Sequence, residues 1–394
     1  MHFNQLLERK GAKVALITTS GYEDVIEIGR QARSSLYNLF ICRESPLVPQ
    51  VLRWGVKERV TATGEVVSGV KKSDLKKIST KLKRQAGMNM SKVLTIDVGA
   101  GTMDVLYIDT ASECYYKAVV RSPVCSTAER ILTASGKMLI VGVEMGGGTV
   151  SQAIRQRADG EAVLISETAA KTLSHNLEKA RPRGLEVIED TRACDLVATG
   201  DHSVVTLADL ELERIRGIVD GFGVSFEFDV VGVCVQDHGK APQGVSTLDY
   251  RHTHFRRALD RQPTPDALLY RSDEVPEDMS RLCAVRDTAL NLPSTTVYIM
   301  DSGMAAILGA TQDSRVRACH HAIVLDVATS HTIAASFSGN ELCSFVEYHT
   351  KDIRLDRMET LLQELAEGQL RHAKILTEGG HGAYTRRAHT LKHS

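Results

Sequence analysis

The stretch from Lys92 to Asp109 reads Lys-Val-Leu-Thr-Ile-Asp-Val-Gly-Ala-Gly-Thr-Met-Asp-Val-Leu-Tyr-Ile-Asp. Apolar runs rich in β-branched residues lie on both sides of Gly99 and Gly101, a pattern that predicts two strands joined by a glycine-containing turn. Glycine permits a positive φ and a close approach of the backbone to a ligand, so successive N–H groups of such a turn can bind an anion. We therefore predict a phosphate-binding hairpin, to which Thr102 adds a hydroxyl group.

Asp97 and Asp104 flank the predicted turn. A carboxylate is repelled by a phosphate unless a hard cation lies between the two groups, and Mg²⁺ prefers oxygen ligands. We therefore predict that Asp97 binds Mg²⁺, directly or through a water molecule. The alternative is a glycine-rich hairpin whose acidic side chains only cap the turn.

The pattern Asp97-x-Gly-x-Gly-Thr-x-Asp104 resembles the first phosphate loop of the superfamily that contains actin, the sugar kinases and the 70-kDa heat-shock ATPases. This resemblance implies an α/β protein with an actin-like (ribonuclease H-like) two-lobed ATPase fold, and ATP and Mg²⁺ as its ligands. It implies nucleotide contacts by Gly99, Gly101, Thr102 and Asp104. Asp97 is then both a metal ligand and a catalytic residue.

A second region has the order of elements found in the superfamily, in which a helix with small residues directly precedes the second phosphate hairpin. Residues 297–310 predict a strand, a turn and a helix with small residues on one face, and residues 322–337 and 342–348 predict three further strands. By resemblance, Asp326 is the catalytic aspartate of a second phosphate loop, and Thr332 is its nucleotide-binding threonine. The loop reads Val-Ala-Thr-Ser-His where the superfamily has glycines, and alanine disfavours a positive φ by about 1 kcal/mol or more.

Residues 373–384 place Gly379 and Gly380 after a predicted strand, which is similar to the adenosine loop of the superfamily. We therefore expect both glycines to contact the nucleotide. The expected domains are residues 90–300, a first lobe with insertions, and residues 301–394, a second lobe that carries the second phosphate loop.

Residues 1–89 form a partial α/β segment of different character, for which we predict a helix end at 5–10, a strand at 14–18, a helix at 22–33 and two strands about a Thr-Gly turn in 58–67. Residues 1–90 contain sixteen Lys and Arg against eight Asp and Glu, although the whole chain has a net charge of −1. The run that begins at Leu6 and the later Pro46-Leu-Val-Pro and Glu58-Arg-Val resemble the N-terminal region of the hydantoinase/oxoprolinase family, whose members cleave amide rings at the expense of ATP. The phosphate hairpin of that family is expected before Leu6, and Met90 resembles a start site, so we expect a fusion of a partial segment with a complete protein.

Residues 90–385 also resemble an uncharacterised prokaryotic family of the actin-like superfamily that is sometimes labelled as pyruvate formate-lyase activating enzyme-like. That radical chemistry needs a Cys-x-x-x-Cys-x-x-Cys cluster, and the chain has none. The eight cysteines also lack any Cys-x-x-Cys pair, so neither a zinc ribbon nor a redox dithiol is indicated.

Length and composition limit the kinds of protein to which this chain can belong. A chain of 394 residues is long enough for two or three domains, and no apolar run reaches the roughly 18 residues of a membrane helix. The N-terminus becomes charged at once, so no signal peptide is indicated and we expect a cytoplasmic protein with no membrane partner. The basic run at 72–84 predicts a helix with a solvated face rather than a nucleic-acid site.

Strands and helices alternate through residues 115–290, including an expected helix at 167–179. The glycine run 146–148 can bind an anion at a helix N-terminus or form a tight packing turn. We predict that His252 and His254 lie at the surface of an arginine-rich helix rather than in a metal site.

We interpret the chain as an ATP-binding, Mg²⁺-dependent protein that transfers a phosphoryl group to an unknown small-molecule acceptor or to water. The first alternative is an ATP-dependent amide-ring hydrolase of the hydantoinase/oxoprolinase type. The second is a non-catalytic nucleotide sensor or partner-binding protein, for which the glycine-poor second loop argues. A protein partner or a homo-oligomer is left open.

Overall fold

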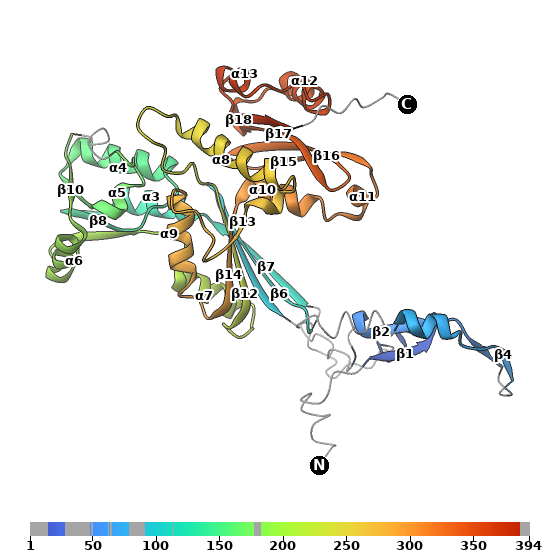
Figure 1. Ribbon diagram of the computed structural model, residues 1–394. Coiled ribbons are helices and arrows are strands. Elements are labelled where there is room, and N and C mark those ends of the chain that lie inside the picture. Colours follow the sequence, from blue (N-terminus) through green and yellow to red (C-terminus); the bar gives the residue numbers. More distant parts are fainter. Residues whose placement is uncertain are drawn as a thin grey trace, which may run out of the picture. The chain divides into compact units, whose positions relative to one another are not determined.

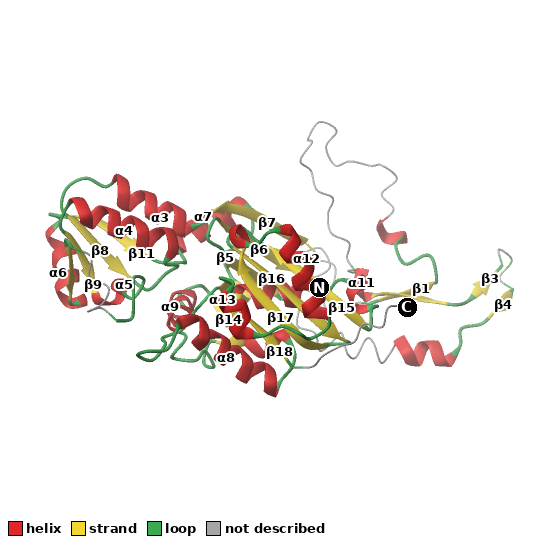
Figure 2. Cartoon of the chain, turned by 90° about the horizontal axis from the view of Figure 1, so that it is seen from above, coloured by secondary structure: helices red, strands yellow, loops and turns green. Residues whose placement is uncertain are grey.

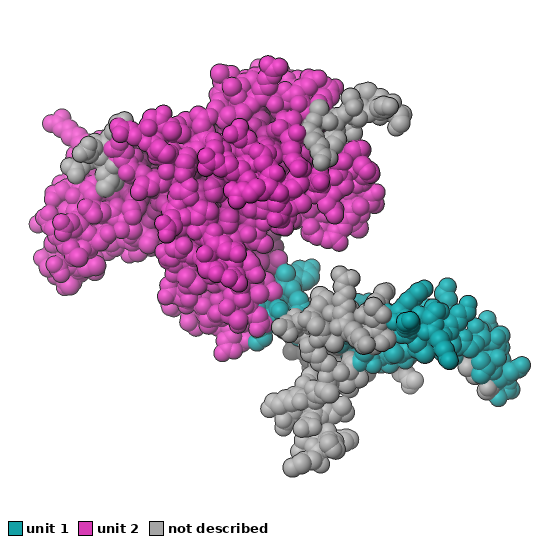
Figure 3. Space-filling view, in the orientation of Figure 1, with its two compact units in different colours: residues 1–92, 108–115 teal, residues 93–107, 116–394 magenta. Residues whose placement is uncertain are grey.

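The computed structural model describes residues 15–27, 48, 50–61, 63, 65–78, 91–112, 114–176 and 183–386. The chain divides into two compact units, each described here by itself (Figure 3). The first unit comprises residues 1–92 and 108–115, and the second comprises residues 93–107 and 116–394. Within the described ranges, no helix has the length and apolar composition needed to cross a membrane.

The first unit contains two small sheets. Strand β1 (Leu16–Thr19) is parallel to β2 (Arg53–Val56), and β3 (Arg59–Val60) is antiparallel to β4 (Val66–Ser68). Strand β1 and the β3–β4 pair agree with strands that the sequence predicts, whereas β2 was not predicted. The buried side chain of Arg53 forms an ion pair with Asp24 at 3.0 Å and donates a hydrogen bond to the carbonyl oxygen of Val48 at 2.9 Å. These contacts tie the segment after β1 and the segment before β2 to β2.

The helices predicted in this unit are described only in part. The expected helix over residues 22–33 is represented by the 3₁₀ turn η1 (Val25–Glu27), and residues 28–33 lie outside the described residues. A second 3₁₀ turn, η2 (Gln50–Leu52), precedes β2. Residues 72–78 of the basic segment are helical, and residues 79–84 lie outside the described part, as do the helix end expected at 5–10 and the start site expected at Met90.

The second unit is organised around a six-stranded sheet with the order β13-β14-β12-β5-β6-β7 (Figure 1). Its strands are β5 (Lys92–Val98), β6 (Thr102–Asp109), β7 (Cys114–Arg121), β12 (Phe228–Val235), β13 (Leu269–Arg271) and β14 (Ser294–Asp301). Strand β12 is parallel to both β5 and β14, whereas β13 is antiparallel to β14. The hairpin of β5 and β6 and the third strand β7 confirm the sequence prediction.

Alternation of side chains along β5 decides where its aspartate lies. Leu94, Ile96 and Val98 are buried on one face of the sheet, where helices α7 (Leu212–Gly221) and α9 (Ser280–Ala289) pack. Successive side chains of a strand point to opposite faces. Asp97 therefore belongs to the other face of the sheet.

A four-stranded parallel sheet is inserted between β7 and β12, with the order β10-β9-β8-β11. Its elements are α3 (Pro123–Thr133), β8 (Met138–Gly142), α4 (Gly148–Gly160), β9 (Val163–Ser166), α5 (Glu167–Ala170), β10 (Leu185–Ile188), α6 (Asp190–Thr199) and β11 (Ser203–Leu207). Apolar residues of α3 and α4 pack on one face, and Ala193 of α6 packs with Leu139 and Ile188 on the other (Figure 2). The predicted α/β alternation is confirmed.

The C-terminal part of the second unit contains a four-stranded antiparallel sheet with the order β15-β16-β17-β18. Its elements are α8 (Thr247–Arg261), η3 (Pro265–Leu268), α10 (Ser302–Ala310), α11 (Ser314–Arg317), β15 (His321–Val327), β16 (His331–Ser338), β17 (Glu341–His349), η4 (Thr350–Asp352), α12 (Leu355–Ala366), α13 (His372–Thr377) and β18 (Gly382–Thr385). Helices α8 and α10 pack on one face and α12 and α13 on the other. Burial on both faces explains why six consecutive residues of β16 are buried.

Two element predictions are wrong. The helix expected at 167–179 ends at Ala170, and residues 171–173 form turns. The segment before Gly379 is helix α13 rather than a strand, because Ile375 anchors a helical turn in the core and Gly379, with a φ of +84°, ends it. The N–H of Gly380 then donates to the carbonyl oxygen of Ile375 at 2.8 Å.

Gly142 offers a test of the inserted sheet. It has a φ of +107°, and a Cβ there would lie 2.3 Å from the carbonyl oxygen of Leu207 on β11. We predict that Gly142→Ala lowers the free energy of unfolding by more than about 3 kcal/mol, which is the upper end of the range for most single substitutions. Gly136 has a φ of +79° and nothing within 4 Å, so Gly136→Ala should cost only about 1–2 kcal/mol. Urea unfolding of both variants measures the difference, and equal losses would contradict the packing described here.

Candidate functional site

Asp97 lies among other carboxylates on the face of the central sheet opposite α7 and α9. It is opposite Cys234 of the parallel strand β12, and the hydroxyl of Ser302 donates to its Oδ1 at 2.6 Å. Burial raises the pKa of Asp97, and the negative charges of Asp104, Asp301 and Asp326 raise it further, against the opposing hydrogen bond from Ser302. A group of carboxylates with this mutual repulsion favours a bound cation.

The turn of the first hairpin is held by its own backbone and by Ser122. The N–H of Gly99 donates to the carbonyl oxygen of Thr102 at 3.0 Å, and the hydroxyl of Ser122 donates to the carbonyl oxygen of Gly99 at 2.6 Å. Neither Gly99 nor Gly101 has a positive φ, which corrects the reason expected for these glycines. Glycine at position 101 is instead favoured by a close approach, because a Cβ there would lie 3.2 Å from the methyl group of Thr329, which would have to shift.

Thr329 belongs to the turn between β15 and β16, so the two predicted hairpin turns lie against each other. In that second turn, the N–H of Ala328 donates to the carbonyl oxygen of His331 at 3.0 Å. Asp326 is on β15, opposite Ile333, and burial raises its pKa. The structure therefore brings the two predicted catalytic aspartates into one electrostatic environment.

The remaining predicted site residues support the protein's own turns. Thr332 is buried, and its hydroxyl lies 3.0 Å from that of Thr350, which donates to the carbonyl oxygen of Ala328. Thr102 lies at the start of β6, with its hydroxyl 3.5 Å from a carboxylate oxygen of Asp104. Asp104 also pairs with Lys117 at 2.9 Å.

Gly379 and Gly380 form the C-terminal cap of α13. A Cβ on Gly380 would lie 2.5 Å from a methyl carbon of Ile375 and 2.8 Å from Cζ of Tyr348. The space beside Gly380 is thus occupied by protein side chains. The prediction of an adenosine loop assumed that a strand precedes this turn. Because helix α13 precedes it instead, the structure gives this prediction less support.

Several residues of this region are not found by the sequence motifs. Asp301 ends β14, accepts a hydrogen bond from the N–H of Met304 at 3.1 Å, and accepts another from buried Arg251 at 2.9 Å. Arg251 also lies 3.3 Å from Glu347 of β17. The signal for Asp301 was its position directly after an apolar strand, since the carboxyl ends of parallel strands meet at one edge of a sheet.

The glycine-rich turn before α4 packs against a buried arginine. Arg281 forms a two-pronged ion pair with Asp209 at 2.8 and 2.9 Å, and Asp209 accepts a hydrogen bond from the N–H of Gly146 at 3.2 Å. A Cβ on Gly146 would lie 2.8 Å from Nη2 of Arg281. This geometry favours the packing-turn alternative over an anion site.

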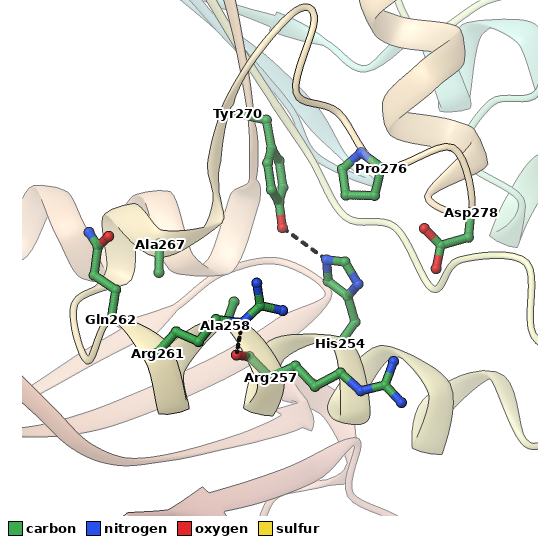
Figure 4. A pocket seen from close by; sticks show the side chains of 9 residues that line it. All are labelled: His254, Arg257, Ala258, Arg261, Gln262, Ala267, Tyr270, Pro276 and Asp278. Carbon is green, nitrogen blue, oxygen red and sulfur yellow. Dashed lines mark hydrogen bonds between the residues drawn. The ribbon is translucent and has the colours of Figure 1, made fainter.

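A pocket of about 450 Å³ lies beside α8 and contains none of the predicted site residues (Figure 4). Nε2 of His254 lies 2.9 Å from the hydroxyl of Tyr270 at its wall. His252, on the same helix, lies 2.6 Å from the carbonyl oxygen of Ala383 and stacks on His372. The two histidines are on a helix as predicted, but they are half-buried rather than at the surface.

Residues 145–394 match the family described as "Putative pyruvate format-lyase activating enzyme (DUF1786)". The chain belongs to this family. Residues 1–89 match the hydantoinase/oxoprolinase N-terminal region. These matches confirm the resemblance of the N-terminal segment to the hydantoinase/oxoprolinase family and of the later part to this uncharacterised family. The placement in the actin-like superfamily stays a prediction. The cluster motif of radical chemistry is absent from this member's sequence.

Curated relatives of this family member match short stretches. The chain is 44% identical over 73 residues to an uncharacterized protein of Methanocaldococcus jannaschii, covering 18% of this chain and 11% of that protein. It is 44% identical over 57 residues to 5-oxoprolinase 1 of Arabidopsis thaliana, covering 14% and 4%. It is 35% identical over 81 residues to the acetophenone carboxylase gamma subunit of Aromatoleum aromaticum, covering 18% and 11%. The matched stretches thus span about a tenth or less of these relatives.

Two solved structures align with most of the chain at low similarity. A nucleotide-free acetone carboxylase covers 86% of this chain and 34% of its own, with 13% identity and a TM-score of 0.18. The ATP-dependent caprolactamase of Pseudomonas jessenii covers 92% and 73%, with 12% identity and a TM-score of 0.19. With TM-scores below 0.5, neither alignment establishes a shared fold.

The raised pKa of Asp97 predicts how its charge affects stability. The native state retains this proton at pH values where the unfolded chain has lost it, so the contribution to stability falls as pH rises through the native pKa. We predict that Asp97→Asn, measured without ligand, is more stable relative to wild type at pH 7.5 than at pH 4. Urea unfolding at both pH values is the measurement, and exposed Asp159→Asn is the control. A difference independent of pH would show that the charge of Asp97 is not destabilising in the free protein.

Proposed function

We propose that this chain binds Mg²⁺ and ATP at the two facing hairpin turns and transfers the terminal phosphoryl group to a small molecule or to water. The observation that carries the proposal is the contact of Gly101 with Thr329, which sets the two turns against each other beside Asp97 and Asp326. Phosphoryl transfer requires mainly positioning and charge neutralisation, which two turns and a cation can supply.

The chemistry of the donors fits this assignment. Asp97 and Asp326 offer carboxylate oxygens, the ligands that Mg²⁺ prefers, and a bound cation relieves the repulsion that raises the pKa of Asp97. Gly101 would supply a backbone N–H group and Thr102 a hydroxyl to the phosphates. Gly99 stays a prediction as a nucleotide contact, because its N–H already donates to the carbonyl oxygen of Thr102. Nucleotide contacts remain a prediction for Thr332, Gly379 and Gly380. The side chain or backbone of each of these residues makes hydrogen bonds within a turn of the protein itself.

The topology of the central sheet supports an actin-like interpretation. Its order β7-β6-β5-β12-β14 joins an antiparallel three-stranded meander to two strands parallel to β5. This is the arrangement expected of a ribonuclease H-like core. The C-terminal sheet departs from a second copy of that core, because β18 pairs antiparallel with β17 and β15 is at the edge.

An ATP-dependent amide-ring hydrolase is the second candidate, and a different observation favours it. Residues 1–89 match the N-terminal region of the hydantoinase/oxoprolinase family, and the curated relatives that match short stretches of the chain include 5-oxoprolinases. In this alternative the second unit would bind the nucleotide, and the acceptor would be the oxygen of an amide carbonyl.

Nucleotide binding can be measured directly. We predict that isothermal titration detects ATP binding that needs Mg²⁺, and that Asp97→Asn weakens the Mg²⁺-dependent part at least about tenfold, or about 1.4 kcal/mol, because one ligand charge is lost. Asp159→Asn, on the exposed side of α4, should bind like wild type. If folded wild-type protein binds no Mg-ATP at millimolar concentration, the proposal fails.

Turnover distinguishes the enzymatic candidates from a binding protein. We predict ATP hydrolysis above background, and a decrease of about 100-fold or more in kcat for both Asp97→Asn and Asp326→Asn, since each removes a charge that holds the reacting phosphate through the metal. Stimulation by 5-oxoproline or a hydantoin would favour the hydrolase. Binding of Mg-ATP without turnover on any acceptor, including sugars, would leave the nucleotide-sensing alternative.

A further inference from the structure

Three histidines from separate strand ends converge at one end of the C-terminal sheet. His331 begins β16 and lies opposite His349, the last residue of β17. His381 directly precedes β18, and its N–H donates to the carbonyl oxygen of Glu347 at 2.8 Å, which holds it beside β17. One ring nitrogen of each histidine lies within 4.8 Å of the others, and Nε2 of His349 is 3.0 Å from Nε2 of His381.

The hydrogen bonds available in this cluster do not satisfy the rings. Nδ1 of His331 lies 2.9 Å from the hydroxyl of Ser330, but its Nε2 is buried with no hydrogen-bond partner among the described residues. Nδ1 of His381 is also buried without such a partner, and the carboxylate of Glu347 lies 3.9 Å from it. A buried unsatisfied polar atom costs about 1–3 kcal/mol. Three packed rings, two of which have a buried nitrogen without a partner, therefore need an explanation other than core packing.

From this geometry we infer that His331, His349 and His381 form a binding site for a divalent transition metal of the zinc type. Three histidine nitrogens with a fourth position free for water or a ligand is an arrangement that suits Zn²⁺. Zn–N bonds of about 2.0–2.1 Å in tetrahedral geometry separate the nitrogens by about 3.3 Å, so small ring movements would complete the site. Imidazole selects zinc, copper, nickel or iron over Mg²⁺, which separates this site from the carboxylates around Asp97.

The surroundings are compatible with a bound cation. Burial lowers the pKa of His331 to about 3 and of His381 to about 4, and neighbouring histidines and Arg251 lower both further, so both rings are neutral, as metal ligands must be. Arg251 is the nearby positive charge, and its ion pairs with Asp301 and Glu347 at 2.9 and 3.3 Å offset its repulsion of a metal.

The site also gives a reason for the unusual second turn. His331 follows Thr329 by two residues, so the same turn that contacts Gly101 delivers a histidine to the cluster. The glycine-poor turn Val-Ala-Thr-Ser-His thus connects the carboxylate site around Asp97 with the histidine cluster, and the two sites have different ligand chemistry. The inference does not depend on nucleotide binding.

Metal binding by the full-length protein tests the site. After removal of metals with a chelator, we predict that titration with Zn²⁺ gives one tight site per chain, and that Co²⁺ gives the intense visible absorption of four-coordinate geometry. His349→Gln, which keeps a similar shape, and His331→Ala should each weaken binding by at least about 100-fold, because even residues that only orient metal ligands contribute 10–100-fold. Excess Mg²⁺ should not compete.

The control is the exposed pair His320 and His321, which could hold a surface ion because Nδ1 of His320 lies 3.2 Å from Nε2 of His321. The double variant His320→Ala with His321→Ala should retain the tight site and the cobalt spectrum. Loss of binding in that double variant, a six-coordinate cobalt spectrum in wild type, or no Zn²⁺ binding below about 10 μM would overturn the inference. The stoichiometry and the cobalt spectrum are measured on wild-type protein. They therefore test the metal site even if one of the histidine variants fails to fold.

Discussion

A buried ion network joins the central sheet to the C-terminal sheet of the second unit. Arg251 of α8 contacts both Asp301 at the end of β14 and Glu347 of β17, and Gln236, just after β12, donates to Glu347 at 2.6 Å. Removing one partner of such a buried group typically costs about 3–5 kcal/mol, because the remaining charge stays buried and unpaired. The network therefore constrains how the two sheets meet.

Both candidate sites lie next to this network. Asp301 caps α10, and the following Ser302 donates to Asp97, so the network and the carboxylate cluster share one turn of chain. On the other side, Glu347 lies near His381 of the histidine cluster. A nucleotide site with oxygen ligands and a metal site with nitrogen ligands would thus be neighbours, connected by the turn that contains Thr329.

The sequence predicted the elements with strong local patterns and missed the contacts that only the fold creates. The hairpin around Gly99, its third strand and the strand followed by a helix within 297–310 were predicted from alternating apolar residues and turn residues, and the structure has all three. The adenosine loop was inferred from Gly379 and Gly380 after a segment predicted as a strand. That segment is a helix because Ile375 is buried, which the local sequence pattern does not reveal. His331, His349 and His381 lie 18 and 32 residues apart, so only the pairing of β16, β17 and β18 brings them together.

The central claim is that the two facing turns hold a nucleotide through Mg²⁺. A crystal structure of the full chain with Mg²⁺ and a non-hydrolysable ATP analogue tests it most directly. We expect the terminal phosphates to lie between the turn that contains Gly101 and the turn that contains Thr329. The metal should be bound by Asp97, either directly or through a water molecule. A nucleotide bound elsewhere in an otherwise unchanged protein, with the carboxylates of Asp97 and Asp326 remote from both phosphate and metal, would contradict it.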